Sequence, residues 1–413
     1  MATGTASDVE HRTVTGSQGI LSHVAFGYSA FIDRNRSVVA TRLTVFPMRP
    51  DALLDAGQLL EAVGEVWPPD GGRVSLNVAS ESLLQDLMRA RPSANLMVEV
   101  PAFMAADPLN TESLVALNSH GNTLLLKGRP LTELPKAVLP CFRQSIIDLD
   151  QDWRLGEPPS SSGRQMPYLQ AGVRTVVEME AAFTRGAQAV LGWPIDDLVS
   201  GAGARKGGGV AAPGMQVIVE LIHRVDREEP IDRLEATLKR DPPLAFKLLR
   251  FINSPAFGLR VEISSFRHAI MLLGYKKLRR WLALLLATAS KDANMKPVMF
   301  AAVRRGLLME ELGRTSGDDE MRSEMFICGV FSLLDRMFQQ PFAELLAAIP
   351  VPERVRQTLV DRTGPFQPYM DVVQAAESES LYDFREAADR LMMGVGEINR
   401  AQLRAAMAAI ELE

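Results

Sequence analysis

Histidines are the side chains best suited to metal or acid–base chemistry near neutral pH, and this sequence has few of them. Its five histidines stand far apart, and none is followed by aspartate; they are His11, His23, His120, His223 and His268. Two clustered metal ions that activate water need several imidazole and carboxylate ligands. This spacing supplies no such set, so we expect no metal ion or other cofactor. We interpret His223 and His268 as capped or half-buried helix residues.

A basic run beside Trp281 is a second candidate for chemistry, because lysine and arginine side chains can contact phosphates. The run consists of Lys276, Lys277, Arg279 and Arg280. The alternative is a solvated helix face from which Leu278 and Trp281 turn inward. Since the whole chain has a formal charge of −5, one basic run is weak support for nucleic-acid binding. We expect instead that these four residues form a protein interaction surface.

The length and composition set limits on the class of protein. With 413 residues the chain can form two domains, since a single core rarely grows beyond about 250 to 300 residues. We expect a disordered segment at 1–19, which has no apolar core for export. The longest apolar runs, such as "WLALLLATA", are shorter than the ~20 residues that cross a bilayer. The expectation is a cytoplasmic protein without membrane insertion, with Cys141 and Cys328 as buried free thiols.

Residues 20–150 alternate between strand and helix signals. Two β-rich runs, "AFID" and "SVVATRLTVF", flank a polar turn, and "GRVSLNVAS", "NLMVEVP", "GNTLLLKG" and "QSIIDLD" are further short strand candidates. Between "GRVSLNVAS" and "NLMVEVP", the segment "SESLLQDLMRA" opens with a serine cap and carries apolar residues on one helical face. Strands that alternate with helices indicate βα units around a parallel sheet or barrel.

The pattern changes after a Gly/Ala-rich stretch, "GAGARKGGGVAAPG", at 201–214. Its composition is typical of a flexible linker. From 215 onward the periodicity is helical, and Gly274 is expected to end one helix. Short tandem helices of this kind predict a compact all-α domain. The expected organisation is therefore an α/β domain at 20–200, a linker at 201–214 and a helical domain at 215–413.

Two segments of the C-terminal half carry a family resemblance. They are "KLLRFINSPAFG" at 247–258 and "ISSFRHAIMLLGYKKLRRW" at 263–281. Together they resemble the HDOD family, signalling relatives of HD-type phosphohydrolases. An active HD site contains a His-Asp pair, but at that place the sequence reads "ICGVFSLLDRMF", with Ser332 and Leu333 in the two positions. The resemblance implies an all-helical HDOD domain that lacks the HD metal ligands and acts as an output surface.

The first 200 residues resemble EAL domains, barrels that hydrolyse cyclic di-GMP and often precede HDOD domains. "FIDRNRSVVATRLTVF" is similar to the opening hairpin, and "GVRTVVEMEAAFTRGAQAVLGWP" to the closing segment. The catalytic positions are largely lost when they are carried over one at a time. The glutamate of the Glu-Ala-Leu signature falls on Arg42, and the paired aspartates fall on Lys127 and Gly128. The late glutamate falls on Arg174, and the glutamine of a Gln-Gly pair on Leu191.

Three EAL site positions are retained, namely Asn77, Glu99 and Asp148. Two-metal hydrolysis of a phosphodiester requires several carboxylates that hold two cations a few ångströms apart. A fixed arginine or lysine at such a place repels a divalent metal ion. The resemblance thus implies a degenerate (β/α) EAL-type barrel followed by an HDOD domain, and no enzymatic activity.

Three functional classes follow from this reading. The first, which we favour, is a non-catalytic bacterial signal-transduction protein that acts through contacts with other signalling proteins. The second is a receptor that binds cyclic di-GMP weakly without hydrolysing it, with Arg42, Lys127 and Arg174 on the phosphates. The third, an active phosphodiesterase, requires ligand clusters that the sequence lacks. The sequence leaves open the identity of the partner, the sign of regulation and whether the chain forms a homodimer.

Overall fold

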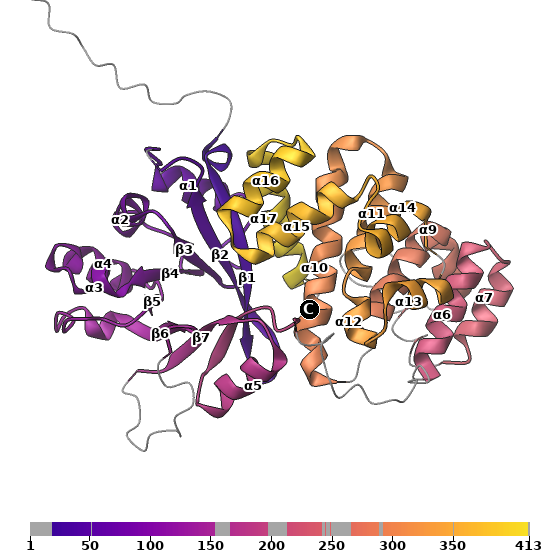
Figure 1. Ribbon diagram of the computed structural model, residues 1–413, viewed down its shortest axis with the longest axis horizontal. Helices are drawn as coiled ribbons and strands as arrows, with labels where there is room; N and C mark the ends of the chain where they lie inside the picture. Colours follow the sequence, from indigo (N-terminus) through magenta and orange to yellow (C-terminus); the bar gives the residue numbers. More distant parts are fainter. Residues whose placement is uncertain are drawn as a thin grey trace, which may run out of the picture.

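The computed structural model describes residues 19–50, 52–152, 166–196, 213–241, 244, 248, 266–288, 292–349 and 351–411. An eight-stranded closed barrel forms the N-terminal part, and helices form the rest (Figure 1). The predicted segment 1–19 lies outside the described residues except for its last residue. The predicted linker lies outside them except at 213–214, where helix α6 begins. Most of the HDOD segment at 247–258 also lies outside them.

The strands follow one another around the barrel in sequence order. They are β1 Val24–Asp33, β2 Val38–Pro47, β3 Val74–Val78, β4 Leu96–Pro101, β5 Leu124–Lys127, β6 Phe142–Asp148, β7 Tyr168–Val173 and β8 Ala189–Gly192. Strand β1 is antiparallel to both of its neighbours, β2 and β8, and every other neighbouring pair is parallel. The predicted barrel architecture is therefore confirmed, and the carboxyl ends of β2 to β8 open on one side.

Helices cover the outside of the barrel. They are α1 Ala56–Gly64, α2 Glu81–Arg89, α3 Ala102–Ala106, α4 Thr111–Ser119 and α5 Val176–Thr184. Helix α2 begins where the sequence predicted, because the side chain of Ser80 accepts a hydrogen bond from the backbone N–H of Leu83. A capping box between Thr175 and Glu178 begins α5 in the same way. These caps fix the residue at which each helix begins after the preceding strand.

The C-terminal part is helical, as predicted. Its elements are α6 Pro213–Asp226, α7 Ile231–Leu238, α9 Phe266–Ala287, α10 Lys296–Leu312, α11 Asp319–Phe331, α12 Leu334–Phe338, α13 Phe342–Ala348, α14 Glu353–Arg356, the π-helical turn η7 Gln357–Asp361, α15 Gln367–Ser378, α16 Leu381–Leu391 and α17 Val395–Glu411. Helix α9 is broken at Gly274, which has a φ of 68°. The predicted helix end at this glycine is confirmed, since few other residues adopt that conformation.

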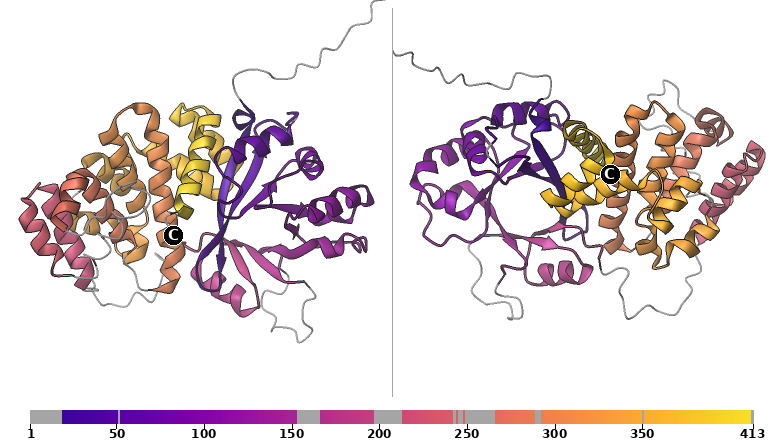
Figure 2. Two further views of the ribbon diagram at one scale, coloured as in Figure 1. Left: turned by 180° about the vertical axis from the view of Figure 1, so that it is seen from behind. Right: turned by 45° about the horizontal axis from the view of Figure 1, so that its top comes forward.

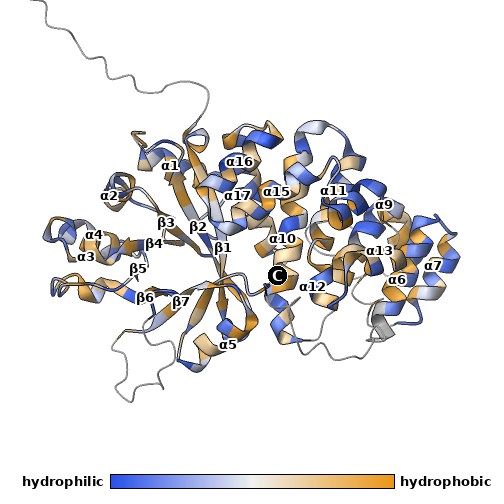
Figure 3. Ribbon diagram, viewed as in Figure 1, coloured by the Kyte–Doolittle hydropathy of each residue, from blue (hydrophilic) through white to orange (hydrophobic). Residues whose placement is uncertain are grey.

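Helices α15, α16 and α17 lie against β1, between the barrel and the remaining helices (Figures 1 and 2). The fully buried amide of Asn399 on α17 donates to the carbonyls of Leu21 and Val24, both at 2.7 Å, and accepts from the N–H of Phe26 at 3.2 Å. Helix α10, apolar along much of its length in Figure 3, places Arg304 over the ring of Tyr28 at 3.4 Å. One continuous apolar core therefore includes residues of both parts.

Both cysteines are free and buried, as predicted. Burial raises the pKa of the Cys328 thiol to about 12, so it stays protonated at neutral pH. Among the helices of the described ranges, none is both long enough and apolar enough to cross a membrane.

Candidate functional site at the mouth of the barrel

The inside of the barrel has an apolar floor and a polar mouth. The floor contains Phe31, Ala40, Met97, Leu125, Ile146, Leu169, Ala171, Ala189 and Leu191. Since side chains two positions apart on a strand share a face, the next inward residue toward the carboxyl end follows each floor residue by two. On β2, β4, β5 and β6 these next residues are Arg42, Glu99, Lys127 and Asp148. Strand alternation thus gathers four of the predicted site residues at the mouth.

Arg42 and Glu99 form a buried, two-point ion pair across the mouth. The Nε and Nη2 atoms of Arg42 donate to the two carboxylate oxygens of Glu99, each at 2.8 Å. Ser75 donates to the same carboxylate at 2.9 Å. Burial alone lowers the pKa of the Arg42 guanidinium, but the attraction and hydrogen bonds of Glu99 outweigh it and raise that pKa above its ordinary value. The Arg42 guanidinium therefore stays charged.

Lys127 and Asn77 form a second polar contact beside this pair. Lys127 Nζ donates to Asn77 Oδ1 at 2.8 Å, and Asn77 Nδ2 donates to Thr44 Oγ1 at 3.1 Å. Burial, and then repulsion from Arg42, lower the pKa of the Lys127 ammonium. Burial raises the pKa of the Asp148 carboxyl, and a hydrogen bond with Asp150 raises it further.

A glutamate from the far end of the chain completes the mouth. Glu379, directly after α15, accepts from Thr44 Oγ1 at 2.7 Å, from Ser29 Oγ at 3.1 Å and from Arg42 Nη1 at 3.2 Å. It has a φ of 53°, in the left-handed region. A Cβ atom at Gly27 on β1 would lie 3.1 Å from the Glu379 Cα, so glycine permits this close approach. The C-terminal helices thus reach into the mouth.

These contacts do not fit the two divalent metal ions that an EAL phosphodiesterase site implies. Both oxygens of Glu99 bind Arg42, and the amide oxygen of Asn77 binds Lys127. Within the described ranges, no three His, Cys, Asp or Glu side chains are grouped so that they could hold a metal ion. The ion pairs of the mouth neutralise its charges and hold the C-terminal helices, and its described carboxylates are not grouped to bind a metal ion.

Among the described contacts, the other predicted EAL positions form no side-chain hydrogen bond with this network. Gly128 directly follows β5 with a φ of 80°. Arg174 follows β7 and its Nε donates to Asp196 at 2.6 Å. Leu191 belongs to the apolar floor and is 1% exposed. Of the two HD positions, Leu333 is fully buried, and Ser332 accepts a hydrogen bond from Arg305 Nη1 at 3.1 Å.

The predicted interaction surface divides into two pairs of residues. Lys276 and Lys277 are exposed. Arg279 pairs with Asp226 at 3.1 Å, and Arg280 pairs with Glu310 and stacks over the Phe326 ring at 3.8 Å. The two arginines therefore bind within the helical part.

The sequence interpretation did not anticipate Glu379, Glu377 or the arginine pair on α10. Arg304 and Arg305 are both buried, and both bind Glu377. The signal for them is an Arg-Arg pair inside the apolar helix "PVMFAAVRRGLLM", since arginine is almost never buried without a partner. Glu377 and Glu379 have no such signal, because the "AAESES" segment reads as an ordinary helix end.

A family model of the HDOD domain matches residues 213–343. The chain contains an HDOD domain. The matched range ends before α14, so α15 to α17, which contact the barrel, follow it. The predicted HDOD resemblance is confirmed, and the extension of that domain to 413 stays a prediction.

Similarity to known proteins spans both parts of the chain. The cyclic di-GMP phosphodiesterase CdgJ of Vibrio cholerae is 25% identical over 314 residues, which are 74% of this chain and 71% of CdgJ. The uncharacterized protein YuxH of Bacillus subtilis is 28% identical over 179 residues; these are 42% of this chain, and the match spans only 43% of YuxH. The PaMucR phosphodiesterase, solved in complex with c-di-GMP, matches at 14% identity and a TM-score of 0.32, over 41% of this chain and 89% of its own. The chain is thus related to a cyclic di-GMP phosphodiesterase and carries an HDOD domain.

Proposed function

We propose that this chain is a non-catalytic signalling protein, in which a degenerate EAL-like barrel holds an HDOD-containing helical part that acts on partners through protein contacts. The observation that carries the proposal is the two-point ion pair between Arg42 and Glu99. An arginine stands where the sequence comparison with EAL domains expects a metal-binding carboxylate. Its charge is fixed and repels a divalent cation, and it occupies both oxygens of the nearest retained carboxylate.

The electrostatic balance of the mouth supports a structural role. Two cations, Arg42 and Lys127, lie among the carboxylates of Glu99, Glu379 and Asp148. Glu379 comes from the C-terminal helices, so the cations of the barrel stabilise its contact with them. Charged groups in a phosphodiesterase site must instead be free to hold metal ions and substrate.

Binding of cyclic di-GMP without hydrolysis is a second candidate, favoured by the relation to CdgJ. Arg42 and Lys127 could contact phosphates if Glu379 were withdrawn from the mouth. With Glu379 in place, a dinucleotide phosphate would meet a carboxylate that already accepts three hydrogen bonds. This candidate therefore requires a movement of the α15–α16 connection.

The proposal is tested by incubating the full chain with cyclic di-GMP and either Mg²⁺ or Mn²⁺, and measuring linear product by chromatography. We expect no turnover above a sample without protein. Glu99→Gln is the matched variant, because it removes the carboxylate that any remaining metal site would need. Turnover by the wild type that disappears in Glu99→Gln, while the variant keeps the circular dichroism of the folded chain under the assay conditions, would contradict the proposal. A calorimetric titration with the same nucleotide separates the two candidates, since saturable binding without turnover supports the receptor.

A further inference from the structure

A second polar site lies between the barrel and the helical part, outside the barrel mouth. It is a cavity of about 440 Å³, a size typical of small-molecule sites. The loops after β7 and β8 form one wall, and residues of α10, α12, η7 and α15 form the others. The two predicted positions that did not join the barrel mouth network, Arg174 and Ser332, both line this cavity.

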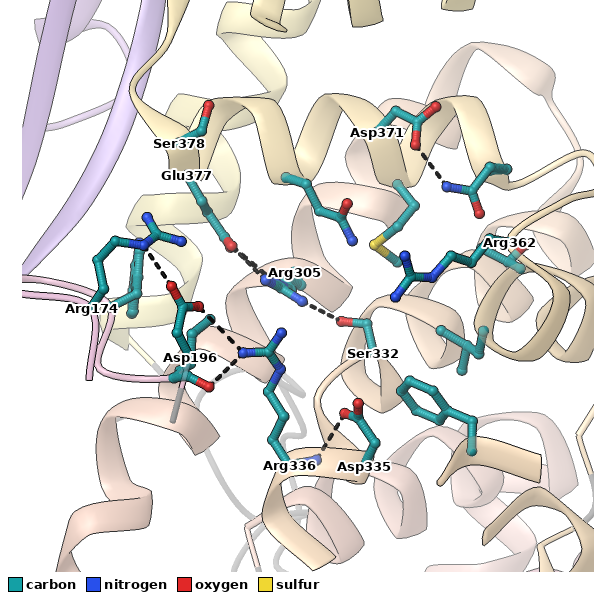
Figure 4. A pocket seen from close by; sticks show the side chains of 18 residues that line it. Arg174, Asp196, Arg305, Ser332, Asp335, Arg336, Arg362, Asp371, Glu377 and Ser378 are labelled. Carbon is teal, nitrogen blue, oxygen red and sulfur yellow. Dashed lines mark hydrogen bonds and ion pairs between the residues drawn. The ribbon is translucent and has the colours of Figure 1, made fainter. Parts of the chain in front are cut away.

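Three guanidinium groups point toward the middle of the cavity (Figure 4). They belong to Arg305 on α10, Arg336 on α12 and Arg362 after η7. Because they come from three separate elements, the side chains converge only when the helical part is folded. Guanidinium groups that meet from several directions are well suited to the tetrahedral oxygens of a phosphate group.

The arginines around the cavity outnumber the carboxylates that they bind. Arg174 and Arg336 share the single carboxylate of Asp196, at 2.6 and 3.5 Å. Arg305 shares the carboxylate of Glu377 with the neighbouring Arg304, at 2.6 and 3.1 Å. These two acids therefore serve four arginines.

Four arginines line the cavity, and the fourth is Arg362. Its backbone N–H donates to the carbonyl of Gln357, but across the described part of the chain its guanidinium has no hydrogen-bond or ion-pair partner, although the residue is exposed and the side chain points inward. It is thus the group most available to an added anion.

Two further acids line the cavity, which brings its lining to four arginines and four carboxylates. Asp371 accepts from Gln367 at 2.7 Å and pairs with Arg390, which is outside the cavity, at 3.6 Å. Asp335 accepts from the backbone N–H of Arg336 at 2.8 Å, and burial raises the pKa of its carboxyl. The side chain of Phe342, half-buried at the wall, offers apolar surface to the rest of a ligand.

We propose that this cavity binds a small phosphate monoester, with Arg305, Arg336 and Arg362 on the phosphate group and the remainder of the molecule against Phe342. The cavity is much larger than a phosphate ion alone, so an organic phosphate fills it better. The ligand also competes with Glu377 for Arg305. Since Glu379 stands two residues further along, binding in the cavity and the contact at the barrel mouth act on the same short segment.

The experiment is a calorimetric titration of the full chain at fixed ionic strength, with AMP, GMP and inorganic phosphate as probes. We expect saturable binding of a nucleoside monophosphate below about 1 mM, and weaker binding of inorganic phosphate. Arg362→Gln should weaken the Kd of the nucleotide at least about tenfold, the scale of one charge-assisted hydrogen bond. The Kd of Arg362→Lys should lie between those of the wild type and Arg362→Gln, because lysine keeps the charge but lacks the planar guanidinium.

Arg89→Gln is the matched control, because Arg89 is also exposed but lies on α2, outside the cavity. Its affinity for the probes should equal that of the wild type. Two results would overturn the proposal: no saturable binding of any probe, or equal affinities in Arg362→Gln and the wild type. Neither depends on whether the barrel hydrolyses cyclic di-GMP, so this test fails or succeeds separately from the proposed function.

Discussion

The barrel mouth and the cavity both contain arginines paired with acidic side chains, but the two sites differ in how completely each arginine is paired. In the mouth, Arg42 has the whole carboxylate of Glu99 and part of Glu379. At the cavity, Arg305 shares Glu377 with Arg304 behind it, and the guanidinium of Arg362 has no partner among the described residues. In a site whose charges are matched within the chain, removing one partner leaves the other buried and uncompensated, whereas a site with an unpaired guanidinium can take an anion.

The two sites are connected by one short segment. Glu377 lies in the last turn of α15 and binds Arg305 on α10, and Glu379 directly follows α15 and binds Thr44 on β2 and Ser29 on β1. A change in the environment of one glutamate therefore acts on the backbone that carries the other. This connection gives a physical route by which a ligand in the cavity could alter how the helical part sits on the barrel.

The largest expected effect comes from breaking the matched pair of the mouth. Glu99→Gln leaves the buried Arg42 guanidinium with Glu379 as its one remaining ion-pair partner among the described residues, and we expect the free energy of unfolding to fall by about 3 kcal/mol. Urea denaturation followed by circular dichroism measures this. Glu386→Gln, in the exposed pair with Arg390, is the control and should change stability by less than about 0.5 kcal/mol. Equal effects of the two variants would mean that the mouth pair is not structural.

Removing one arginine from the shared pair of the cavity should cost less. Arg305→Met leaves Arg304 on Glu377, so that carboxylate keeps a partner, and we expect a loss of about 2 kcal/mol. The same denaturation measurement applies. A loss as large as that of Glu99→Gln would show that Glu377 depends on Arg305 as fully as Arg42 depends on Glu99. The contrast between the two sites would then be removed.

Strand alternation explains why the composition of the mouth could be predicted from sequence. Once the barrel strands are recognised, the side chains of Arg42, Glu99 and Lys127 must share the inner face, two positions beyond apolar floor residues. The same alternation explains Leu191, which lies in the floor. Local periodicity also predicted the α2 cap at Ser80 and the break at Gly274.

The contribution of Glu379 could not be predicted, because nothing local marks it. It lies 337 residues from Arg42 in the sequence, at a helix end of ordinary composition. Its role depends on how α15 to α17 dock on β1, through contacts such as those of Asn399. The cavity likewise exists only after the loops of β7 and β8 meet the helical part, so its arginines are dispersed in the chain.

A smaller effect distinguishes the two halves of the predicted interaction surface. Arg280→Ala removes the pair with Glu310 and the contact with the Phe326 ring, and should lower the free energy of unfolding by about 1 kcal/mol. Lys277→Ala removes an exposed side chain and should have almost no effect on stability. Thermal melting of both variants checks this. Equal melting temperatures would mean that Arg280 is as available to partners as Lys277.

The smallest expected effect is a pH dependence from Lys127. Its pKa in the folded chain is lower than the 10.5 of an ordinary lysine, so between these two values the unfolded chain binds more protons. Stability contributed at this position therefore increases as pH rises through the lowered pKa toward 10.5. Lys127→Met should remove that increase. The difference in unfolding free energy between the wild type and Lys127→Met should therefore change between pH 7 and 10. A constant difference across this range would contradict the lowered pKa.

The central claim is that the charges of the barrel mouth hold the C-terminal helices, and a double-mutant cycle between Arg42 and Glu379 tests it most directly. Unfolding free energies are measured by urea denaturation for the wild type, Arg42→Met, Glu379→Gln and the double variant. We predict a coupling of about 1 to 2 kcal/mol, with the double variant less destabilised than the sum of the single ones. Additive effects would show that Glu379 does not bind the arginine, and would contradict the claim.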